Sequence, residues 1–315
     1  MTDVFIDGSA GTTGLRIRER LEKRADIRLI TLPEADRKDP KKRREALNDA
    51  QIVFLCLPDD AAREAAGWIG NGHTRVIDTS TAHRVHPDWT YGFPELKGQR
   101  EKIRTSRRIA NPGCHASGLI ALIAPLRDAG FLKPDAQVSC TSITGYSGGG
   151  KKMIAEYEGE DASPLLRAPR FYGLSQQHKH LPEMKRWAGL ENDPVFMPVV
   201  CPYYAGMETM IPLSRESVKG TPEEAAEILA SCYRDESIVR FESGCDESGF
   251  LSACAFAGRD DMQLSVFGNG ERFVLTARFD NLGKGASGAA IQNMNLLLGV
   301  DEKTGLVTGG TDENH

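Results

Sequence analysis

The sequence lacks any long run of apolar residues. A helix that crosses a membrane needs about 18 to 20 consecutive, mostly apolar residues, and no such run occurs among the 315 residues. The first residues, Met1 to Ile6, also lack the basic and apolar regions of a secretory signal and instead lead into a short strand pattern. These absences predict a cytoplasmic protein without a membrane partner.

The cysteines and the net charge exclude further classes. Seven cysteines are an odd number, and no Cys-x-x-Cys pair occurs among them. Neither a disulfide framework nor a zinc knuckle is therefore expected, and no metal site is predicted. A formal net charge of −5 argues against a protein built to bind nucleic acid. Apolar residues form 40% of the chain, enough for the core of a globular protein in a reducing compartment.

Short strands alternate with helices over roughly the first 115 residues. Strands are expected at 4–6, 27–32, 52–57 and 75–78, and helices at 15–24, 41–49 and 61–69. The run from Ile52 to Leu57 is apolar throughout, as a central parallel strand is. This alternation predicts an α/β fold with a doubly wound, parallel (Rossmann) sheet.

A glycine-rich loop joins the first strand to the first helix. Gly8 to Gly14 follows the pattern G-x-x-G-x-x-G in the strand–loop–helix context that a dinucleotide site requires. Glycines let the backbone approach a pyrophosphate, and the helix N-terminus presents free N–H groups to it. The alternative is an ordinary tight turn. The predicted cofactor contacts in this loop are Gly8, Ser9, Gly11, Thr12, Thr13 and Gly14.

The residues after the second strand bear on the choice of nicotinamide cofactor. Glu34 lies about 20 residues past the loop, where an acid can bind a ribose 2′-hydroxyl and favour NAD. Arg37 and Lys38 follow directly and can reach a 2′-phosphate, which favours NADP, and we favour this role for Arg37. The basic residues 41–44 are expected to form a solvated helix face.

Cys114 is the cysteine best placed for chemistry. The segment Asn111 to His115 makes a turn at Pro112–Gly113, and a helix is expected from about Ala116 to Asp128. A helix N-terminus stabilises a thiolate, the nucleophilic form of cysteine. A structural helix cap is the alternative on these residues alone.

A thiol nucleophile needs a base, and histidine is the usual one. His115 adjoins the cysteine, but neighbouring side chains on a helix point in different directions. His178 and His180 are a poor metal pair on a helix, whereas in an extended segment they would share one side. Glu183 could then orient one imidazole, and a surface loop with incidental histidines is the alternative.

The second half of the chain has a different character. Residues 145–152 form a glycine-rich turn that ends in lysines but lacks the Ser or Thr of a P-loop, so either an anion-binding turn or a hinge is possible there. Thr221 and Pro222 begin a helix expected to end at Tyr233, and another helix ends near Leu298. Strands are expected at 138–144, 195–197, 208–213, 250–257, 262–268 and 271–280. Turn-linked strands of this kind predict an antiparallel or mixed sheet in an α+β domain.

Six segments together carry a resemblance to a known family: residues 8–14, 78–84, 91–96, 111–114, 178–183 and 280–285. The first and last occur across the wider aspartate-semialdehyde dehydrogenase superfamily. The combination of Tyr91–Leu96, Asn111–Cys114 and His178–Glu183 is more specific. The sequence resembles the N-acetyl-γ-glutamyl-phosphate reductases in the shorter of their two forms.

The resemblance implies a domain organisation and a reaction. A Rossmann domain would comprise residues 1–114 plus about 283–315, and a catalytic and oligomerisation domain residues 115–282. The enzyme would be a cytoplasmic homo-oligomer, a dimer or tetramer, that takes part in arginine biosynthesis. It would use NADPH to reduce an acyl phosphate through a cysteine thioester, releasing inorganic phosphate and a semialdehyde.

The resemblance also implies roles for individual residues. Cys114 would be the nucleophile, and His178 or His180 the acid/base, with His178 preferred. Further cofactor contacts would come from Ser80, Ser147, Gly148 and Asn281. Substrate contacts would come from Asn111, Arg84, Lys151, Glu183 and Lys284.

Two other functions remain open at this point. An aspartate-semialdehyde dehydrogenase would share Cys114, phosphate and NADP, but its base lies in a different, later motif than His178–Glu183. A dinucleotide sensor without catalysis would keep the glycine loop and make Cys114 structural. The sequence also leaves open whether the acylated substrate is free or attached to a carrier protein.

Overall fold

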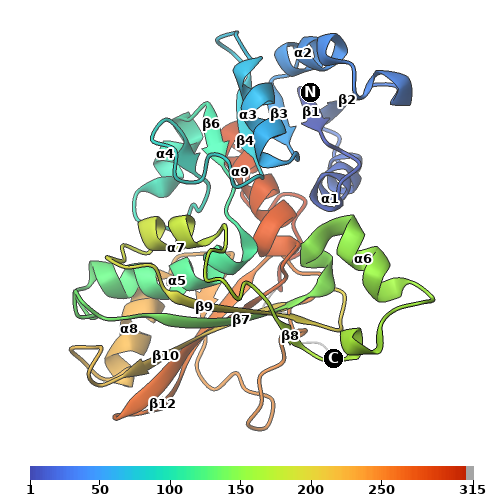
Figure 1. Ribbon diagram of the computed structural model, residues 1–315. Helices are drawn as coiled ribbons and strands as arrows, with labels where there is room; N and C mark the ends of the chain where they lie inside the picture. Colours follow the sequence, from blue (N-terminus) through green and yellow to red (C-terminus); the bar gives the residue numbers. More distant parts are fainter. Residues whose placement is uncertain (310–315) are drawn as a thin grey trace. The chain divides into compact units, whose positions relative to one another are not determined.

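The computed structural model describes residues 1–309 (Figure 1). The chain divides into two compact units. The first contains Met1–Pro112 and Ala286–Leu306, and the second contains Gly113–Gly285 with the described residues after Leu306. These limits differ by a few residues from the predicted domain boundaries at 114 and 283. The predicted first domain also included residues 310–315, which lie outside the described residues.

The first unit is built on a six-stranded sheet of order β2-β1-β3-β4-β6-β5, in which every neighbouring pair is parallel. This confirms the predicted doubly wound sheet. In such sheets, ligands bind beyond the carboxyl ends of the strands where the strand order reverses, here at β1 and β3. The strands are β1 (Thr2–Asp7), β2 (Ile27–Ile30), β3 (Ile52–Leu55), β4 (Arg75–Asp78), β5 (Thr90–Tyr91) and β6 (Arg108–Ala110).

Helices cover both faces of this sheet. Alternate residues of β1 and β3 face opposite sides: Val4 and Phe54 pack with Ile17 of α1, whereas Phe5 packs with Leu47 of α2. Two hydrophobic clusters thus lie on the two faces, as a doubly wound fold requires. The helices of this unit are α1 (Thr12–Leu21), η1 (Glu34–Asp36), α2 (Pro40–Asp49), α3 (Asp59–Gly67), α4 (Gln99–Thr105) and α9 (Gly288–Leu298).

The second unit is built on a mixed, seven-stranded sheet of order β11-β12-β13-β10-β7-β9-β8. β7 pairs with β9 in parallel, whereas β10 pairs with β7 and β13 antiparallel. The predicted mixed sheet is therefore confirmed, and the strands expected at 262–268 and 271–280 pair as an antiparallel hairpin of β12 and β13. The strands are β7 (Ser139–Gly145), β8 (Arg170–Phe171), β9 (Val195–Cys201), β10 (Met207–Ser214), β11 (Val239–Phe241), β12 (Met262–Asn269) and β13 (Arg272–Phe279).

Helix α5 (Cys114–Asp128) is the central helix of the second unit. It packs against β10, β13, α7 and α8 (Figure 1), and twelve of its residues, His115 to Leu126, are buried. Gly118 permits its close approach to the sheet, because a Cβ there would lie 2.4 Å from Thr209 Oγ1. The other helical segments are η2 (Tyr146–Gly149), α6 (Gly150–Glu158), η3 (Pro164–Arg167), α7 (Leu181–Trp187), α8 (Pro222–Cys232) and the π-helix η4 (Gly283–Ser287).

Two predictions for the second half are wrong. The apolar segment Phe250–Ala257 is not a strand: its first three residues have no regular structure and the rest form turns. Gly249 before it has a φ of +87°, and Phe250 is 76% exposed, so the segment does not enter the sheet. Residues 145–152 form η2 and the first turn of α6, where Lys151 and Lys152 are exposed. The lysines therefore belong to a helix and not to an open loop.

Candidate active site and cofactor site

The glycine loop of the first unit has no room for side chains at two positions. Gly8 has a φ of +87°, and a Cβ on it would lie 2.2 Å from the backbone oxygen of Cys56. A Cβ on Gly14 would lie 2.5 Å from the backbone oxygen of Gly8. Gly11 caps α1 without a side-chain hydrogen bond, which leaves the N–H groups of the first turn available to an anion. The helix begins at Thr12, three residues earlier than predicted.

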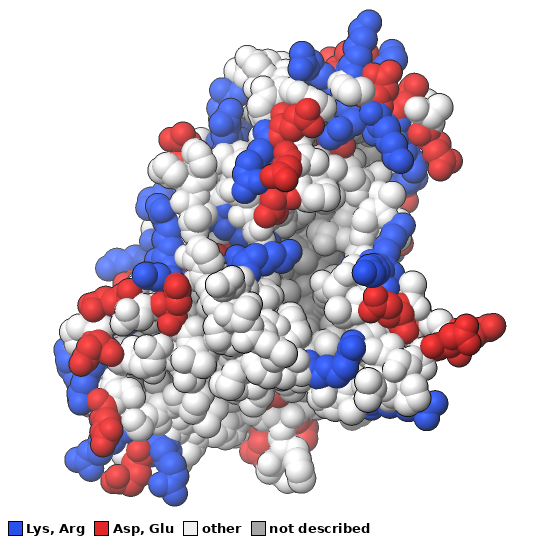
Figure 2. Space-filling view, viewed as in Figure 1, with Lys and Arg blue, Asp and Glu red and all other residues white. Residues whose placement is uncertain are grey.

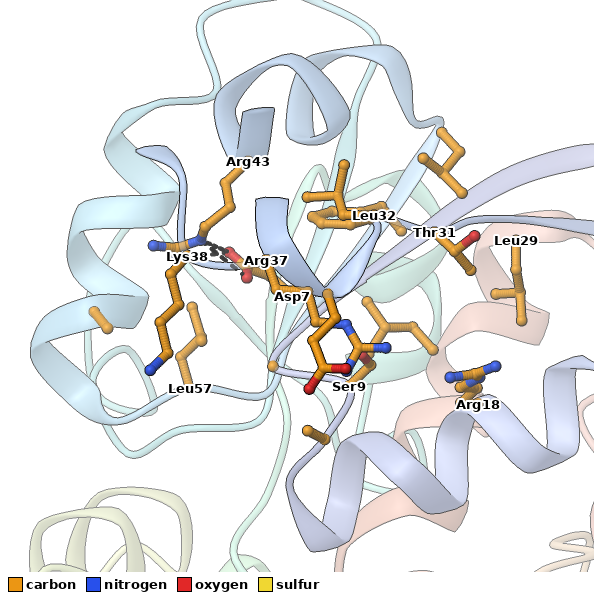
Figure 3. Close-up of a pocket in the computed structure, with 17 residues that line it drawn as sticks. Asp7, Ser9, Arg18, Leu29, Thr31, Leu32, Arg37, Lys38, Arg43 and Leu57 are labelled. Carbon is orange, nitrogen blue, oxygen red and sulfur yellow. Dashed lines mark hydrogen bonds and ion pairs between the residues drawn. The ribbon is translucent and has the colours of Figure 1, made fainter. Parts of the chain in front are cut away.

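A cavity of about 480 Å³ lies beside this loop, within the first unit. Its lining includes Gly8 and Ser9, the end of β2 and the segment that follows it (Figure 3). Four of its residues are cations, Arg18, Arg37, Lys38 and Arg43, and two are anions, Asp7 and Glu34. Figure 2 shows basic and acidic side chains intermixed over the end of this unit that carries α2. The cavity therefore combines apolar walls with an excess of positive charge beside an anion-binding turn.

Arg43 differs from the solvated role predicted for residues 41–44. Its Nη2 donates a hydrogen bond of 2.8 Å to Asp7 (Figure 3). Its guanidinium lies 4.9 Å from the Trp68 ring centre. Asp7 is 5% exposed and stands at the end of β1. The other three basic residues of the segment are exposed, as predicted. Arg43 thus forms a fixed wall of the cavity, whereas Arg37 and Lys38 are exposed.

Three residues predicted to bind cofactor or substrate form part of the framework of the first unit. Ser80 donates a hydrogen bond of 2.8 Å to Asp78. Arg84 is buried, and its Nε donates to the backbone oxygen of Asn111 at 2.9 Å. Asn111 in turn donates to the backbone oxygen of Ala286 at 3.0 Å. These bonds fix the chain just before Cys114.

Cys114 is the first residue of α5 and is half-buried. The dipole and free N–H groups of a helix N-terminus favour the thiolate form. Cys140 and Cys56 lie in different surroundings: burial raises the pKa of Cys140 and raises that of Cys56 to about 12. Gly285 lies directly against Cys114, since a Cβ on Gly285 would be 2.8 Å from the Cβ of Cys114.

Glu183 of α7 binds the turn that carries Cys114. Its Oε1 accepts a hydrogen bond of 2.7 Å from the backbone N–H of Gly113, and the residue is 1% exposed. The sequence had suggested that Glu183 orients an imidazole or binds substrate. The bond to Gly113 adds a role that no sequence motif indicates, because the partner is a backbone group. Glu183 therefore fixes the backbone at the N-terminus of α5.

Three histidines lie together beside the start of α5. The ring centres of His178 and His180 are 4.8 Å apart, and each is less than 6 Å from the ring centre of His115. A turn joins His178 to α7, because Leu181 donates a backbone hydrogen bond to the oxygen of His178 and α7 begins there. Burial, followed by the charge of Lys179, lowers the pKa of His178 to about 4. His178 is therefore a neutral imidazole at pH 7.

His115 is the functional candidate that the sequence reasoning set aside. Burial lowers its pKa to about 3. Its Nδ1 is 2.8 Å from Ser142 Oγ, and its Nε2 is 2.7 Å from the Tyr172 hydroxyl. Neither Ser142 nor Tyr172 stands out in the sequence, so no motif signals this cluster.

A second polar cluster of this unit joins Asn281, Ser147 and Gly148. Asn281 Nδ2 donates to Ser147 Oγ at 3.0 Å, and its Oδ1 accepts from the backbone N–H of Gly206 at 3.0 Å. Gly148 is exposed beside them. The three residues predicted to line the cofactor cleft are therefore neighbours. Lys284 is 1% exposed in the π-helix, next to Gly285.

Comparison with known proteins identifies the family. A family model described as the semialdehyde dehydrogenase NAD-binding domain matches residues 3–106, and one described as the semialdehyde dehydrogenase dimerisation domain matches residues 114–281. The chain is 50% identical to the N-acetyl-gamma-glutamyl-phosphate reductase of Brucella anthropi over 306 residues, which is 94% of this chain and 98% of that protein. The chain belongs to the N-acetyl-γ-glutamyl-phosphate reductase family.

Other relatives agree with this assignment. The reductase of Sinorhizobium medicae is 48% identical, with the same coverage of both chains. Aspartate semialdehyde dehydrogenase II of Vibrio cholerae matches with a TM-score of 0.67 at 18% identity, covering 95% of this chain and 98% of that chain. The enzyme of Candida albicans, solved with NADP, gives a TM-score of 0.65 at 14% identity, covering 95% and 98%. At such identities these two likenesses concern the fold alone.

Family membership confirms several predictions. The chain is an oxidoreductase of the semialdehyde dehydrogenase type with a nicotinamide-nucleotide domain. The match to a dimerisation domain indicates a homo-oligomer.

Within residues 1–309, no helix has the length and apolar character needed to cross a membrane.

Proposed function

We propose that this chain reduces N-acetyl-γ-glutamyl phosphate to N-acetylglutamate γ-semialdehyde and phosphate, with NADPH as reductant and Cys114 as nucleophile. Cys114 at the start of α5, with three histidines beside it, is the observation that carries the proposal. The names of the relatives in Brucella and Sinorhizobium support the choice of substrate. Arginine biosynthesis in the cytoplasm is the setting that this reaction implies.

The Cys114 thiolate attacks the carbonyl carbon of the acyl phosphate. The carbon–oxygen bond to phosphate breaks, and phosphate leaves as a stable anion, which leaves a thioester on Cys114. A thioester accepts a hydride at neutral pH, whereas a carboxylate does not. The dipole of α5 lowers the cost of forming the attacking thiolate.

His178 supplies acid/base catalysis in this proposal. Burial lowers its pKa to about 4 and so keeps the imidazole neutral at pH 7. A thiolate at Cys114 stabilises the imidazolium, so the ring accepts the thiol proton as the thiolate forms. The resulting imidazolium returns that proton to the sulfur when the carbon–oxygen double bond re-forms and the carbon–sulfur bond breaks, which releases the semialdehyde and regenerates the thiol. His180, whose ring centre is 4.8 Å from that of His178, is the second candidate for this role. Glu183 acts on the backbone at Gly113 and so positions the nucleophile.

The first unit fits a dinucleotide. The crowded positions Gly8 and Gly14 and the uncapped start of α1 suit a pyrophosphate, with Ser9, Thr12 and Thr13 beside it. Arg37 and Lys38 line the adjoining cavity and would hold a 2′-phosphate, which supports NADP over NAD. When bound, NADPH supplies the hydride that reduces the thioester. Ser80, Ser147, Gly148 and Asn281 are proposed as further cofactor contacts.

The remaining proposed contacts concern the substrate. Lys284 precedes Gly285, which lies against Cys114, and is proposed to bind the phosphate or the α-carboxylate of the substrate. Arg84, Asn111 and Lys151 are retained as candidates from the family resemblance. Aspartate-semialdehyde dehydrogenase is the alternative function, because it would share the Cys114 nucleophile, phosphate and NADP.

Turnover in the reverse direction tests the proposal. The purified protein is given N-acetylglutamate semialdehyde, phosphate and NADP, and NADPH formation is followed by absorbance. Aspartate semialdehyde, NAD and the Cys114→Ser variant are run in parallel. We expect turnover with the acetylated aldehyde and NADP, and its loss in the variant. Turnover with aspartate semialdehyde alone would assign the chain to the alternative, and full activity in Cys114→Ser would exclude the mechanism.

A further inference from the structure

A continuous hydrogen-bonded chain of buried side chains runs from the central sheet to the surroundings of Cys114. Thr209 Oγ1 of β10 is 3.2 Å from Ser142 Oγ of β7. Ser142 Oγ is 2.8 Å from His115 Nδ1, and His115 Nε2 is 2.7 Å from the Tyr172 hydroxyl. Thr209, Ser142 and His115 are each at most 2% exposed. This series of hydrogen bonds therefore begins inside the sheet at Thr209 and ends at the Tyr172 hydroxyl.

The His115 ring is buried and has contacts on several sides. Phe196 packs edge-on against it with ring centres 5.3 Å apart, and both ring nitrogens have partners. Burial keeps the imidazole neutral, because it lowers the pKa to about 3. A neutral imidazole has one donor and one acceptor nitrogen. An uncharged His115 can therefore accept a hydrogen bond from Ser142 at one nitrogen and donate one to Tyr172 from the other.

Tyr172 follows β8 and is held from two sides. Its backbone N–H donates to the oxygen of Pro198 at 3.0 Å, and its hydroxyl meets His115. Its ring centre is 5.8 Å from that of His178. Burial first, and the negative charge of Cys114 second, raise the pKa of the Tyr172 hydroxyl. This hydroxyl thus keeps its proton, and its contact with His115, the residue after Cys114, places it beside the first turn of α5.

We propose that His115 is a positioning residue that holds the Tyr172 hydroxyl as a hydrogen-bond donor toward the reacting carbonyl oxygen at Cys114. In this arrangement Thr209 donates to Ser142, Ser142 donates to His115 Nδ1, and His115 Nε2–H donates to the Tyr172 oxygen. The proton of Tyr172 then points to the oxygen that becomes negative when the thiolate adds. No proton is transferred along the chain, and this role rests on the proposed function of Cys114.

A fixed donor aimed at a developing oxyanion acts mainly on the transition state. Removing one such donor costs about 100- to 1000-fold in kcat in well-studied enzymes. A side chain that only fills space would, when replaced, lower the stability of the fold and leave kcat close to its original value. Replacing an oxyanion donor should therefore lower kcat, whereas replacing a side chain that only fills space should lower stability.

The experiment compares Tyr172→Phe, His115→Gln and the double variant with the unmodified protein. We expect Tyr172→Phe to lower kcat about 100-fold, at the lower edge of such effects, with little change in KM. His115→Gln should lower kcat less, because glutamine retains a donor. In the double variant the His115 change should add nothing further, since its effect passes through the Tyr172 hydroxyl.

Tyr233→Phe is the matched control. The Tyr233 hydroxyl is also buried and donates a hydrogen bond of 2.7 Å to α5, at the backbone oxygen of Ala121. Its loss should reduce thermal stability and leave kcat unchanged. A second readout is ¹⁵N NMR of the His115 ring, which should show the neutral Nε2–H tautomer.

The outcomes separate the two proposals. If Cys114→Ser is inactive but Tyr172→Phe keeps its kcat, the positioning role is wrong and Cys114 remains the nucleophile. The positioning role is also wrong if the effects of Tyr172→Phe and His115→Gln on kcat multiply in the double variant. The Nδ1–H tautomer would likewise overturn it. If Cys114→Ser keeps full activity, the proposed function itself fails, whatever the His115 variants do.

Discussion

The carboxylate of Glu183 accepts a hydrogen bond of 2.7 Å from the backbone N–H of Gly113, one residue before Cys114. The first N–H groups of a helix have no partner within the helix. Gly113 is the N-cap residue of α5, and its own N–H donates to the buried carboxylate of Glu183 in α7. The start of α5, and with it the thiol of Cys114, is therefore fixed by a side chain 70 residues further along the chain.

Replacing Glu183 should disturb the nucleophile as well as the fold. Glu183→Ala leaves the buried Gly113 N–H without its acceptor, a loss of about 1 to 3 kcal/mol in the free energy of unfolding. Glu183→Gln keeps an acceptor oxygen and should lose less. Urea unfolding and the alkylation rate of Cys114 at pH 7 measure the two effects. Equal stability and equal alkylation in Glu183→Ala and the unmodified protein would contradict this role.

The cofactor preference should depend on the exposed cations of the cavity. Arg37→Ser and Lys38→Ser each remove a charge that would meet a 2′-phosphate. Loss of a hydrogen bond to a charged group costs about 1.5 to 3 kcal/mol, so KM for NADPH should rise by roughly 10-fold or more. KM for NADH should stay nearly constant. Lys41→Ser is the matched control, because Lys41 is exposed on α2 and outside the cavity lining. Parallel changes for both cofactors would exclude 2′-phosphate recognition by these residues.

Arg84 offers a choice between a framework role and a substrate role. Its Nε and Nη2 donate to the backbone oxygens of Asn111 and Thr79. Arg84→Met leaves these oxygens without their donor, so the free energy of unfolding should fall by about 2 kcal/mol or more, since each unsatisfied buried group costs about 1 to 3. Thermal or urea unfolding measures this change. A stable variant whose only change is a raised substrate KM would favour direct substrate binding.

The stability of the fold should decrease in mild acid. The folded state keeps His115 and His178 neutral until the pH approaches about 3 and about 4, whereas an unperturbed histidine binds a proton near 6.5. Between these values the unfolded chain holds more protons, so the free energy of unfolding falls as the pH drops below 6.5. Urea unfolding at pH 7.5 and pH 5 should show the loss, and His115→Gln should show less of it. His73→Gln, an exposed histidine, should behave like the unmodified protein.

Local patterns were sufficient to predict much of the fold. The run Ile52–Leu57 and the loop Gly8–Gly14 were recognised from their own residues. β1, α1 and β3 formed where a strand, a helix and a strand were expected, with α1 shifted by three residues. The capping box at Thr221 is equally local. The segment Phe250–Ala257 shows where such reasoning fails. Its apolar content suits a strand, but the left-handed backbone at Ser248 and Gly249 turns the chain before it.

The polar contacts of the site could not be predicted in this way. His115 meets Tyr172 across 57 residues of sequence and Ser142 across 27, through the register of β7, β9 and the segment after β8. No periodicity relates these positions. Glu183 binds a backbone N–H, which has no signature in side-chain sequence at all. The sequence identified Cys114 and His178 as reactive candidates but not the groups that hold them.

A phosphate-free burst tests the central proposal, a thioester on Cys114, most directly. The enzyme is mixed with N-acetylglutamate semialdehyde and NADP without phosphate, so that hydride transfer occurs but the acyl group cannot leave to phosphate. We predict a rapid burst of NADPH of about one equivalent per active site, and an N-acetylglutamyl adduct located on Cys114 by peptide mass spectrometry. Cys114→Ser should show neither. A burst of equal size in Cys114→Ser, or an adduct on another residue, would contradict the account.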